Sequence, residues 1–498
     1  MTKSGSLPIA NAENFVFLQL DGEGAAYQQL TRALKVAILD GSLHAGMRLL
    51  PTRALARELN MSRITVLAAY DQLRAEGYLQ SRVGSGSYVC NLQLTPPLHP
   101  PRNGSIAPQT RYAKRARSLS DRSIVRLHHG LQFNLQHGEV SNHPTLNHVW
   151  GRELARAAAY TPLERTASEG SLALREQVCK YLANRRGVRA TADDVLIVNG
   201  SQQAFGLAAR LLVDEGDPVV MEEPQYFGAW RSFAAHGAKL QAVRTDAEGL
   251  VCSELPKDSP RLICVTPSHQ FPSGPVMSLS RRLELLRYAE ANACWILEDD
   301  YDSEFRYDSQ PLAALRALDQ GDRVIYVGTF SKVMFGSLRL GYMVLPAALR
   351  QDFANAKYLS DMGGLAIEQA AMAHFMESGA FERHLRLVGK TLKQRREVML
   401  EELRRHAGDR VQIADSHAGM HVVVWLPEYS YPQQDELIEY AHDLGLGLYP
   451  IAPFYQERPT VPGLILGYCG LSISELREAM RLFGSCLDVI DARGRAPT

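Results

Sequence analysis

The residue best suited to covalent chemistry is Lys332, in the segment Gly328-Thr329-Phe330-Ser331-Lys332. The segment follows a short apolar run, and Arg339 lies seven residues beyond the lysine. A lysine at a strand end, with hydroxyls and an arginine nearby, can form a Schiff base while its neighbours hold a phosphate. An isolated lysine is more commonly a surface residue, so this interpretation depends on what the other strand ends supply.

Two further segments supply an anion site and an acid. The apolar run at 195–198 is followed by Gly200-Ser201-Gln202, which opens a helical pattern. Free backbone N–H groups and the helix dipole attract anions there, although such a turn is as often a simple cap. The run at 294–297 is followed by Glu298-Asp299-Asp300-Tyr301. Clustered acids at a strand end are often solvated or hold a metal.

Together the three segments fit pyridoxal phosphate. This cofactor needs an amine, an acid that keeps its pyridine nitrogen protonated, and a donor-rich cup for its phosphate. In this order of motifs the chain resembles the fold-type I aminotransferases. The resemblance implies Lys332 as the Schiff-base lysine and Asp299 on the pyridinium nitrogen, with Asp300 as the rival acid. It also implies Tyr301 on the 3-hydroxyl, Tyr226 stacked on the ring, and a phosphate held by Ser201, Gln202, Thr329, Ser331 and Arg339.

Two positions depart from the aminotransferase pattern. Phe271 stands where these enzymes usually carry an asparagine, which removes a hydrogen bond to the 3-hydroxyl unless Gln270 or His269 replaces it. Near the C-terminus, Leu464-Ile465-Leu466 stands where many relatives place the arginine that grips a substrate carboxylate. An apolar side chain cannot replace a bidentate arginine–carboxylate pair, so Arg458 or Arg231 would have to serve.

The elements that must position these residues are short buried strands separated by helices. Apolar runs of this kind are typical of a mostly parallel sheet, whose ligands bind at the carboxyl ends of the strands. The sequence therefore predicts an α/β fold with helices on both faces. The resemblance to fold-type I aminotransferases further implies a smaller C-terminal α+β subdomain from about residue 390. The runs are 195–198, 218–221, 262–265, 294–297, 324–327 and 342–345.

The N-terminal segment has a different character. Helical patterns at 27–41, 52–59 and from Ser62 to about Glu76 are followed by two short strands around a glycine turn at 78–89. Two helices joined by a tight turn and followed by a wing predict a DNA-binding winged helix-turn-helix. A structural or dimerising module without nucleic acid is the less favoured interpretation. The predicted DNA contacts are Arg53, Ser62, Arg63, Thr65, Arg82, Gly84 and Gly86.

Residues 20–90 resemble the GntR-type winged helix, through the segments that begin at Leu49-Leu50-Pro51 and Ala69-Tyr70-Asp71. This head followed by an aminotransferase-like domain resembles the MocR/GabR family of regulators. The resemblance implies a transcription factor that binds operator DNA and senses a small amine or amino-acid-like molecule, or the cofactor itself. It further implies a homodimer, often head-to-tail, in which Tyr160 is a candidate phosphate contact to the partner's site.

Composition supports this division of the chain. The 498 residues hold 54 basic and 54 acidic side chains, but residues 1–130 carry 16 basic against 8 acidic ones. The Pro-rich segment 94–110 predicts a linker, so we expect a DNA-binding domain at 20–90, a basic linker at 91–130 and an effector domain at 131–498. In the linker, Lys114, Arg115 and Arg117 either contact phosphates or stay solvated.

The same composition limits cofactors and location. No apolar run approaches the length of a membrane span, and the seven cysteines are scattered without metal-site spacing. We therefore expect a cytoplasmic protein without a metal. The leading prediction is a regulator rather than an enzyme, although partial transamination is compatible with the residues. The alternatives are a working aminotransferase that carries a DNA-binding head, and a repressor whose large domain is only a scaffold.

Overall fold

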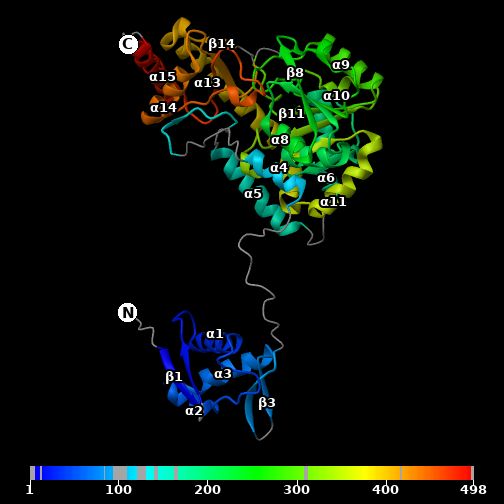
Figure 1. The fold of residues 1–498 in the computed structure, drawn as a ribbon. Coiled ribbons are helices and arrows are strands. Elements are labelled where there is room, and N and C mark those ends of the chain that lie inside the picture. The colour runs from blue at the N-terminus through cyan, green and yellow to red at the C-terminus, as the bar shows by residue number, and fades with distance from the viewer. Residues whose placement is uncertain are drawn as a thin grey trace. The chain divides into compact units, whose positions relative to one another are not determined.

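The computed structural model describes residues 6–11, 14–82, 85–92, 109–120, 130–138, 144–161, 167–307, 312–414 and 418–494. The chain divides into two compact units, residues 1–108 and 109–498 (Figure 1). Within the described ranges, no helix is both long and apolar enough to cross a membrane.

The N-terminal unit is a winged helix-turn-helix preceded by a hairpin. Its elements are β1 (Ser6–Asn11), β2 (Asn14–Gln19), α1 (Ala26–Leu39), α2 (Thr52–Glu58), α3 (Arg63–Ala75), β3 (Leu79–Arg82) and β4 (Gly86–Val89). The three helices and the antiparallel wing lie where the sequence predicts them. The β1–β2 hairpin was not predicted, and it precedes the expected domain start at residue 20.

Apolar side chains of all three helices form one core in this unit. Leu30 and Leu34 of α1 pack with Leu55 of α2 and with Val66 and Tyr70 of α3. The hydroxyl of Tyr70 donates a hydrogen bond to the carbonyl of Leu50 at 2.9 Å, so the buried ring keeps its polar end satisfied. This core holds the three helices against one another.

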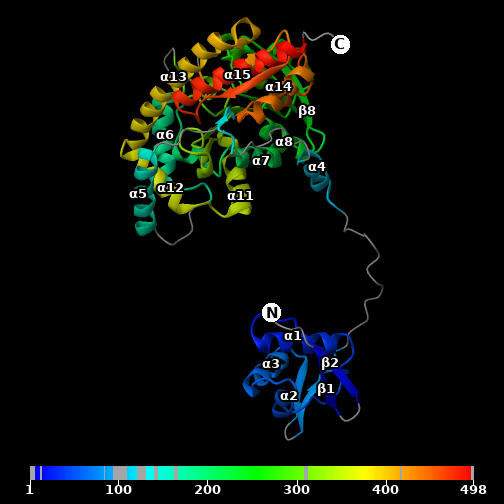
Figure 2. The same ribbon diagram turned by 90° about the vertical axis from the view of Figure 1, so that its left-hand side faces the viewer.

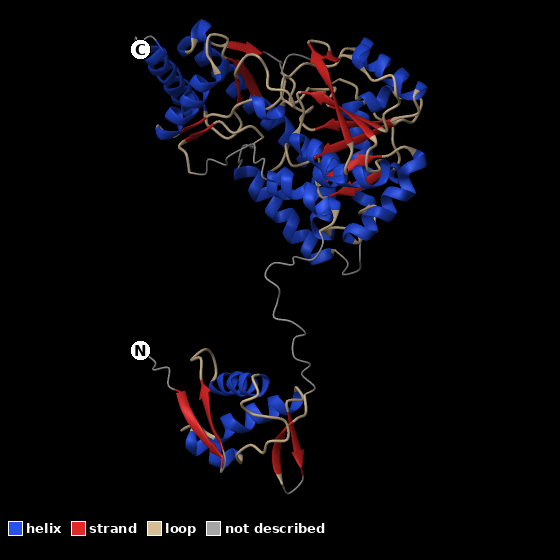
Figure 3. Cartoon of the chain, in the orientation of Figure 1, coloured by secondary structure: helices blue, strands red, loops and turns tan. Residues whose placement is uncertain are grey.

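An eight-stranded sheet forms the centre of the large unit (Figure 3). Its order is β6 (Val195–Val198), β13 (Gly341–Val344), β12 (Val324–Thr329), β11 (Trp295–Asp300), β10 (Leu262–Val265), β7 (Pro218–Glu223), β8 (Lys239–Asp246) and β9 (Gly249–Leu250). Strands β13 and β9 run antiparallel to their neighbours, and the others are parallel in direction. All six apolar runs are strands of this sheet, which confirms the predicted fold.

Helices cover both faces of the sheet. Alternate residues of a strand therefore pack into different hydrophobic cores. In β10, Leu262 and Cys264 pack in the core that contains Phe205 of α7, whereas Ile263 packs with Leu285 of α9. The flanking helices are α6 (Leu172–Arg186), α7 (Ser201–Leu212), α8 (Phe227–His236), α9 (Leu279–Ala291), α10 (Leu315–Leu318), α11 (Arg350–Asp361) and α12 (Ala366–Glu377). This burial on both faces explains why the strands are continuously apolar.

The C-terminal part forms a smaller α+β subdomain. A three-stranded antiparallel sheet of β14 (Gln412–Ala414), β15 (His421–Trp425) and β17 (Gly463–Gly467) packs with α13 (Ala380–His406), α14 (Tyr431–Asp443) and α15 (Ile473–Gly494). The short strand β5 (Phe133–Asn134) pairs in parallel with β16 (Leu446–Gly447). This pairing ties residues 133–138 to the subdomain, next to its strand β17. Helix α5 (Pro144–Tyr160) follows and packs against α12.

Helix α4 (Arg111–Ser120) lies within the segment predicted as a linker and packs along α8 (Figure 2). Arg115 donates hydrogen bonds to the carbonyls of Ala235 at 2.9 Å and His236 at 3.3 Å, at the C-terminal end of α8. Its guanidinium also pairs with Glu215 at 3.0 Å. The expectation that Arg115 contacts phosphate or stays solvated is therefore wrong, because α8 offers it unpaired terminal carbonyls.

Candidate functional site

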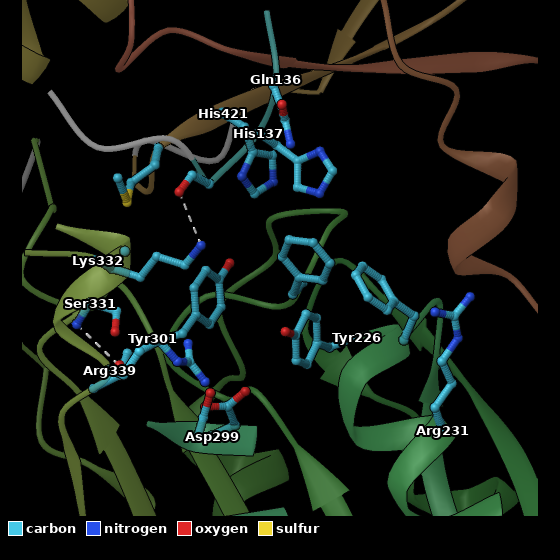
Figure 4. A pocket seen from close by; sticks show the side chains of 17 residues that line it. Gln136, His137, Tyr226, Arg231, Asp299, Tyr301, Ser331, Lys332, Arg339 and His421 are labelled. Carbon is cyan, nitrogen blue, oxygen red and sulfur yellow. Dashed lines mark hydrogen bonds between the residues drawn. The ribbon is translucent and has the colours of Figure 1, made fainter. Parts of the chain in front are cut away.

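A cavity of about 500 Å³ lies at the carboxyl ends of β11 and β12, between the large sheet and the small subdomain (Figure 4). Eight of the nine predicted cofactor residues line it, although they come from four separate segments of the chain. The lining residues are Gln136, His137, Gly138, Ser201, Tyr226, Phe227, Arg231, Phe271, Asp299, Tyr301, Thr329, Ser331, Lys332, Gly336, Arg339, Met420 and His421.

The two candidate acids on β11 point to opposite faces of the sheet, as neighbours in a strand must. Asp300 forms a buried ion pair with Arg186 at 2.7 Å and accepts a hydrogen bond from Tyr326, so its role is structural. Asp299 lines the cavity, and its Oδ1 has no hydrogen-bond partner among the described residues. Burial, together with the Asp300 carboxylate, raises the pKa of Asp299 to about 8. The geometry favours Asp299 as the cofactor acid.

Lys332 reaches the cavity on the side opposite Arg231 (Figure 4). Its Nζ lies 3.3 Å from the carbonyl oxygen of Gly138, and burial lowers the pKa of its amine. Gly138 has φ of +80°, and a Cβ there would stand 2.5 Å from Nζ. The glycine therefore lets the backbone of residues 136–138 approach the amine closely.

An anion cup is formed by the first turn of α7 and the segment after β12. Ser201 opens α7, and Gly200 before it has φ of +78°. The guanidinium of Arg339 lies against this turn, with Nη2 donating to the carbonyl of Asn199 at 3.4 Å. The Ser331 hydroxyl is buried, and no described group bonds to it. Backbone N–H groups, a hydroxyl and an arginine are the donors that a phosphate requires.

Gln202 is the one predicted cofactor residue outside the cavity lining. Its amide donates to Ser232 Oγ at 2.6 Å and to the carbonyl of Gly228 at 3.3 Å, so the side chain ties α7 to α8. Only the backbone of Gln202, in the first turn of α7, remains suited to anion binding. The sequence motif correctly puts Gln202 in the first turn of α7. It does not reveal that α8 lies close enough to bind the amide of its side chain.

Aromatic rings form the remaining walls on the cofactor side. The Tyr226 ring meets the Phe271 ring edge to face, with centroids 5.7 Å apart. The Tyr301 hydroxyl lies 2.8 Å from His269 Nδ1. Of the two proposed substitutes for the missing asparagine, His269 thus touches Tyr301. The amide of Gln270 is instead used by its own loop and donates to the carbonyls of Pro224 and Phe271.

The upper wall was not found from the sequence. Gln136 and His137 follow β5, whereas Met420 and His421 lie at the start of β15. Burial lowers the pKa of His137 to about 4 and that of His421 to about 3, so both rings are neutral at pH 7. His421 Nε2 lies 2.8 Å from the carbonyl of Pro272, which assigns the ring proton to that nitrogen. Isolated histidines in short segments carry no motif, so only the fold brings them together.

The two candidate replacements for the carboxylate-binding arginine lie in different places. Ile465 is fully buried with Val423 and Phe454, so this position serves the core. Arg458 stacks on the ring of Tyr431 at 3.3 Å from its centroid and does not line the cavity. Arg231 does line it, beside the ring of Phe227.

Those of the predicted DNA-binding residues that the structure describes lie on the surface of the winged helix. The hydroxyl of Ser62 accepts the backbone N–H of Thr65 at 3.0 Å and so caps α3. Arg63 in the first turn is exposed, and so is Arg53 on α2. On the wing, Arg82 lies over the ring of Tyr88, and Gly86 has φ of +116°. Gly84 lies outside the described residues.

Comparison with known proteins agrees with both units. Residues 26–89 match the family of bacterial regulatory proteins, gntR family, and residues 132–454 match aminotransferase class I and II. The chain is 36% identical over 487 residues to a probable rhizopine catabolism regulatory protein, MocR, of Rhizobium meliloti, covering 96% of this chain and 97% of that one. The chain belongs to the MocR family of GntR-type regulators.

A second relative is also named as a transcriptional regulator. The chain is 29% identical over 442 residues to the HTH-type pyridoxine biosynthesis transcriptional regulator PdxR of Corynebacterium glutamicum, covering 88% of this chain and 91% of the relative. The aminotransferase-like unit is similar to LysN, an α-aminoadipate aminotransferase of Thermus thermophilus solved with N-(5′-phosphopyridoxyl)-L-leucine. The TM-score is 0.68 at 27% identity, covering 77% of this chain and 98% of the enzyme. This MocR-family protein is thus an HTH-type transcriptional regulator with an aminotransferase-like domain.

Proposed function

We propose that the protein is a pyridoxal-phosphate-dependent regulator that senses a small amine through the 500 Å³ cavity and binds its operator through α3 and the wing. One observation carries the proposal. Lys332 shares the cavity with two buried polar atoms that lack a described partner, Asp299 Oδ1 and Ser331 Oγ. Buried polar groups are normally satisfied, so these atoms mark a place for a polar ligand.

Residues of the cavity suit both the pyridine nitrogen and the phosphate of pyridoxal phosphate. Asp299, whose pKa burial raises to about 8, would gain a positive partner in a protonated pyridine nitrogen. Ser201, Thr329, Ser331 and Arg339 supply donors for the phosphate. When bound, pyridoxal phosphate supplies an aldehyde carbon that exchanges between the lysine amine and a free amine. The lowered pKa of Lys332 favours the neutral amine that this exchange requires.

The cavity walls beyond Lys332 limit which chemical groups the effector can carry. Two neutral histidines and the rings of Phe227 and Phe271 face the cavity, and Arg231 supplies a cation at the far end. With Ile465 in the core, the described residues offer no arginine at the usual carboxylate position. An effector amine therefore either lacks an α-carboxylate or presents an anionic group towards Arg231. Amino-acid-like molecules with such an anionic group fit this class, and the cofactor itself is the alternative effector.

A working aminotransferase is the second candidate, because Lys332, Asp299 and the phosphate donors form a complete set. The core position of Ile465 weighs against efficient turnover of ordinary amino acids, since a carboxylate without its arginine is poorly held. The regulatory names of the curated relatives support the same choice. We assign the cavity to sensing, with at most partial transamination.

The functional unit is a homodimer of head-to-tail arrangement. The end of α11 and the start of α12 expose large apolar side chains, among them Leu359 at 85%, Met362 and Leu365. Apolar groups clustered in this way are suited to a second copy of the chain. Tyr160 at the end of α5 is 81% exposed, as a residue that reaches a partner's phosphate cup must be.

Helix α8 offers the route from effector to DNA. Its first turn contributes Phe227 to the cavity and Arg231 lies one turn further, while Arg115 of α4 holds its last carbonyls. A small movement of α8 on effector binding would reach α4 and the chain that leads to the DNA-binding unit. The effector must bind two arrangements with different affinity for such coupling to work.

The visible absorption spectrum of the purified protein with pyridoxal phosphate tests the proposal. The titrants are a panel of amines, amino acids and sulfonates. For a sensor we expect one compound to move the cofactor band, and the band to stay moved when a keto acid is added. Continuous cycling with product formation would assign the chain to the aminotransferases. A protein that takes up no cofactor would contradict the proposal.

A further inference from the structure

The outward face of α3 is centred on an apolar residue. Val66, Ala69, Tyr70 and Leu73 of this helix are buried in the core of the winged helix. At about 100° per residue, the position opposite their mean direction is that of Ile64. The Ile64 side chain is 78% exposed, and that of Leu67, one turn further, is 39% exposed. Arg63 and Thr65 lie on the flanks of this face.

Neither core packing nor helix propensity explains why an exposed isoleucine stands at position 64. The core of the unit is complete without it, since Ile64 is absent from the residues that pack there. A β-branched residue is also a weaker helix former than the alanine or arginine that follow it in α3. An exposed isoleucine in the first turn is therefore explained best by what this helix contacts.

The recognition helix of a helix-turn-helix enters the major groove with its N-terminal residues nearest the base edges. Most groups presented there are hydrogen-bond donors and acceptors, which an isoleucine leaves unsatisfied. The exception is the C5-methyl of thymine, with which apolar side chains make favourable contact. The exposed arginines Arg53, Arg63 and Arg82 surround α3 with positive charge, which suits a flanking phosphate backbone.

We propose that Ile64 is a specificity-determining residue that reads thymine by its methyl group. It occupies the middle of the helix face that meets the bases, between the flanking side chains of Arg63 and Thr65. The operator half-site then contains at least one thymine whose methyl group is needed for full affinity.

The test removes each partner of this contact separately. Duplexes are first selected from a random library by the full-length protein, and each thymine of the selected half-site is then replaced by deoxyuridine, which lacks only the methyl. We expect one such replacement to weaken wild-type binding by about three- to tenfold. Ile64→Ala should bind the thymine duplex as weakly as wild type binds the uracil duplex, and should show no further loss on uracil.

Val36→Ala is the matched control, because Val36 is another exposed β-branched residue of the same unit but lies on α1. It should discriminate thymine from uracil as wild type does. The proposal is overturned if wild type binds thymine and uracil duplexes equally at every position, or if Ile64→Ala keeps the full discrimination. If Ile64→Ala binds neither duplex, the wild-type scan decides, together with Ile64→Val, which keeps the branched methyls and should retain discrimination.

Discussion

The DNA-binding unit and the aminotransferase-like unit hold their functional side chains in opposite environments. The proposed DNA contacts Arg53, Arg63 and Arg82 are exposed on the surface of the winged helix. In the cavity, Asp299 and Ser331 are buried with polar atoms that no described residue satisfies. On our proposal the first surface needs no ligand to complete it, whereas a bound ligand satisfies the buried atoms of the second. The comparison predicts that mutations in one unit leave the other function intact.

The largest expected effect separates two neighbouring acids of β11. Asp300→Ala leaves Arg186 buried without its partner, so we expect a loss of about 3–5 kcal/mol in the free energy of unfolding. Asp299→Ala breaks no ion pair among the described residues and should cost far less stability, but it should weaken cofactor binding. Chemical denaturation and cofactor titration of both variants check this. Equal losses of stability would show that Asp299 is also structural.

The second prediction concerns the pH dependence of the cofactor-free protein. The folded-state pKa of Asp299 is about 8, above the unfolded value of about 3.9, so its favourable contribution is present below pH 4 and is lost as the pH rises towards 8. Relative to Asp299→Asn, wild type should lose about 1.4 kcal/mol of stability per pH unit in that window.

Thermal melts of both proteins between pH 5 and 8 measure this difference. Burial also raises the pKa values of Glu222, Glu298 and Glu304 to about 7, but both proteins share these groups, so they cancel in the comparison. Added pyridoxal phosphate should reduce the slope for wild type, because a bound cation offsets the buried charge. If the stability of wild type and of Asp299→Asn changed with pH in the same way, the argument that burial raises the pKa of Asp299 would be refuted.

The third prediction concerns Arg63, an exposed residue of the winged helix. Arg63→Ala should weaken operator binding by about 1–3 kcal/mol, because it removes a charged contact at the first turn of α3. The cofactor spectrum and its response to amines should not change, since the residue lies in the other unit. Fluorescence anisotropy with an operator duplex and absorption spectroscopy report the two functions separately. A shifted cofactor band in Arg63→Ala would contradict the separation.

The smallest expected effect lies at α4. Arg115→Ala should leave both binding functions but reduce the coupling between them, which is typically 1–3 kcal/mol in allosteric proteins. The variant loses the contacts to the last carbonyls of α8 and to Glu215. Operator affinity with and without effector measures the coupling, and Lys114→Ala, an exposed neighbour on α4, is the control. Unchanged coupling in Arg115→Ala would exclude this route.

The sequence predicted the strands well because burial on both faces makes them continuous apolar runs. The run at 262–265 is β10 residue for residue, and Lys332 follows β12 as expected, whereas Asp299 lies within β11, which extends to Asp300. The choice between Asp299 and Asp300 needed the structure, because Arg186 is 114 residues away in the chain. The side chains of Gln136, His137 and His421 were missed for the same reason. No local pattern marks residues that the fold alone brings together.

For helix α4 the prediction from the sequence was wrong, because the segment was expected to be part of a linker. Its basic, proline-free sequence is typical of a linker end, because the residues that stabilise the helix lie 100 or more positions further on. Arginine-rich segments are commonly solvated, but the carbonyls at the end of α8, together with Glu215, hold this helix in place.

The most direct test of the central claim measures operator affinity with and without the effector amine, for wild type and Lys332→Ala, both supplied with pyridoxal phosphate. The account predicts that wild type changes affinity with the amine, while Lys332→Ala binds the operator but gives no response. Lys390→Ala, an exposed lysine of α13, should behave as wild type. A full effector response in Lys332→Ala would contradict the account, because sensing would then not require the lysine.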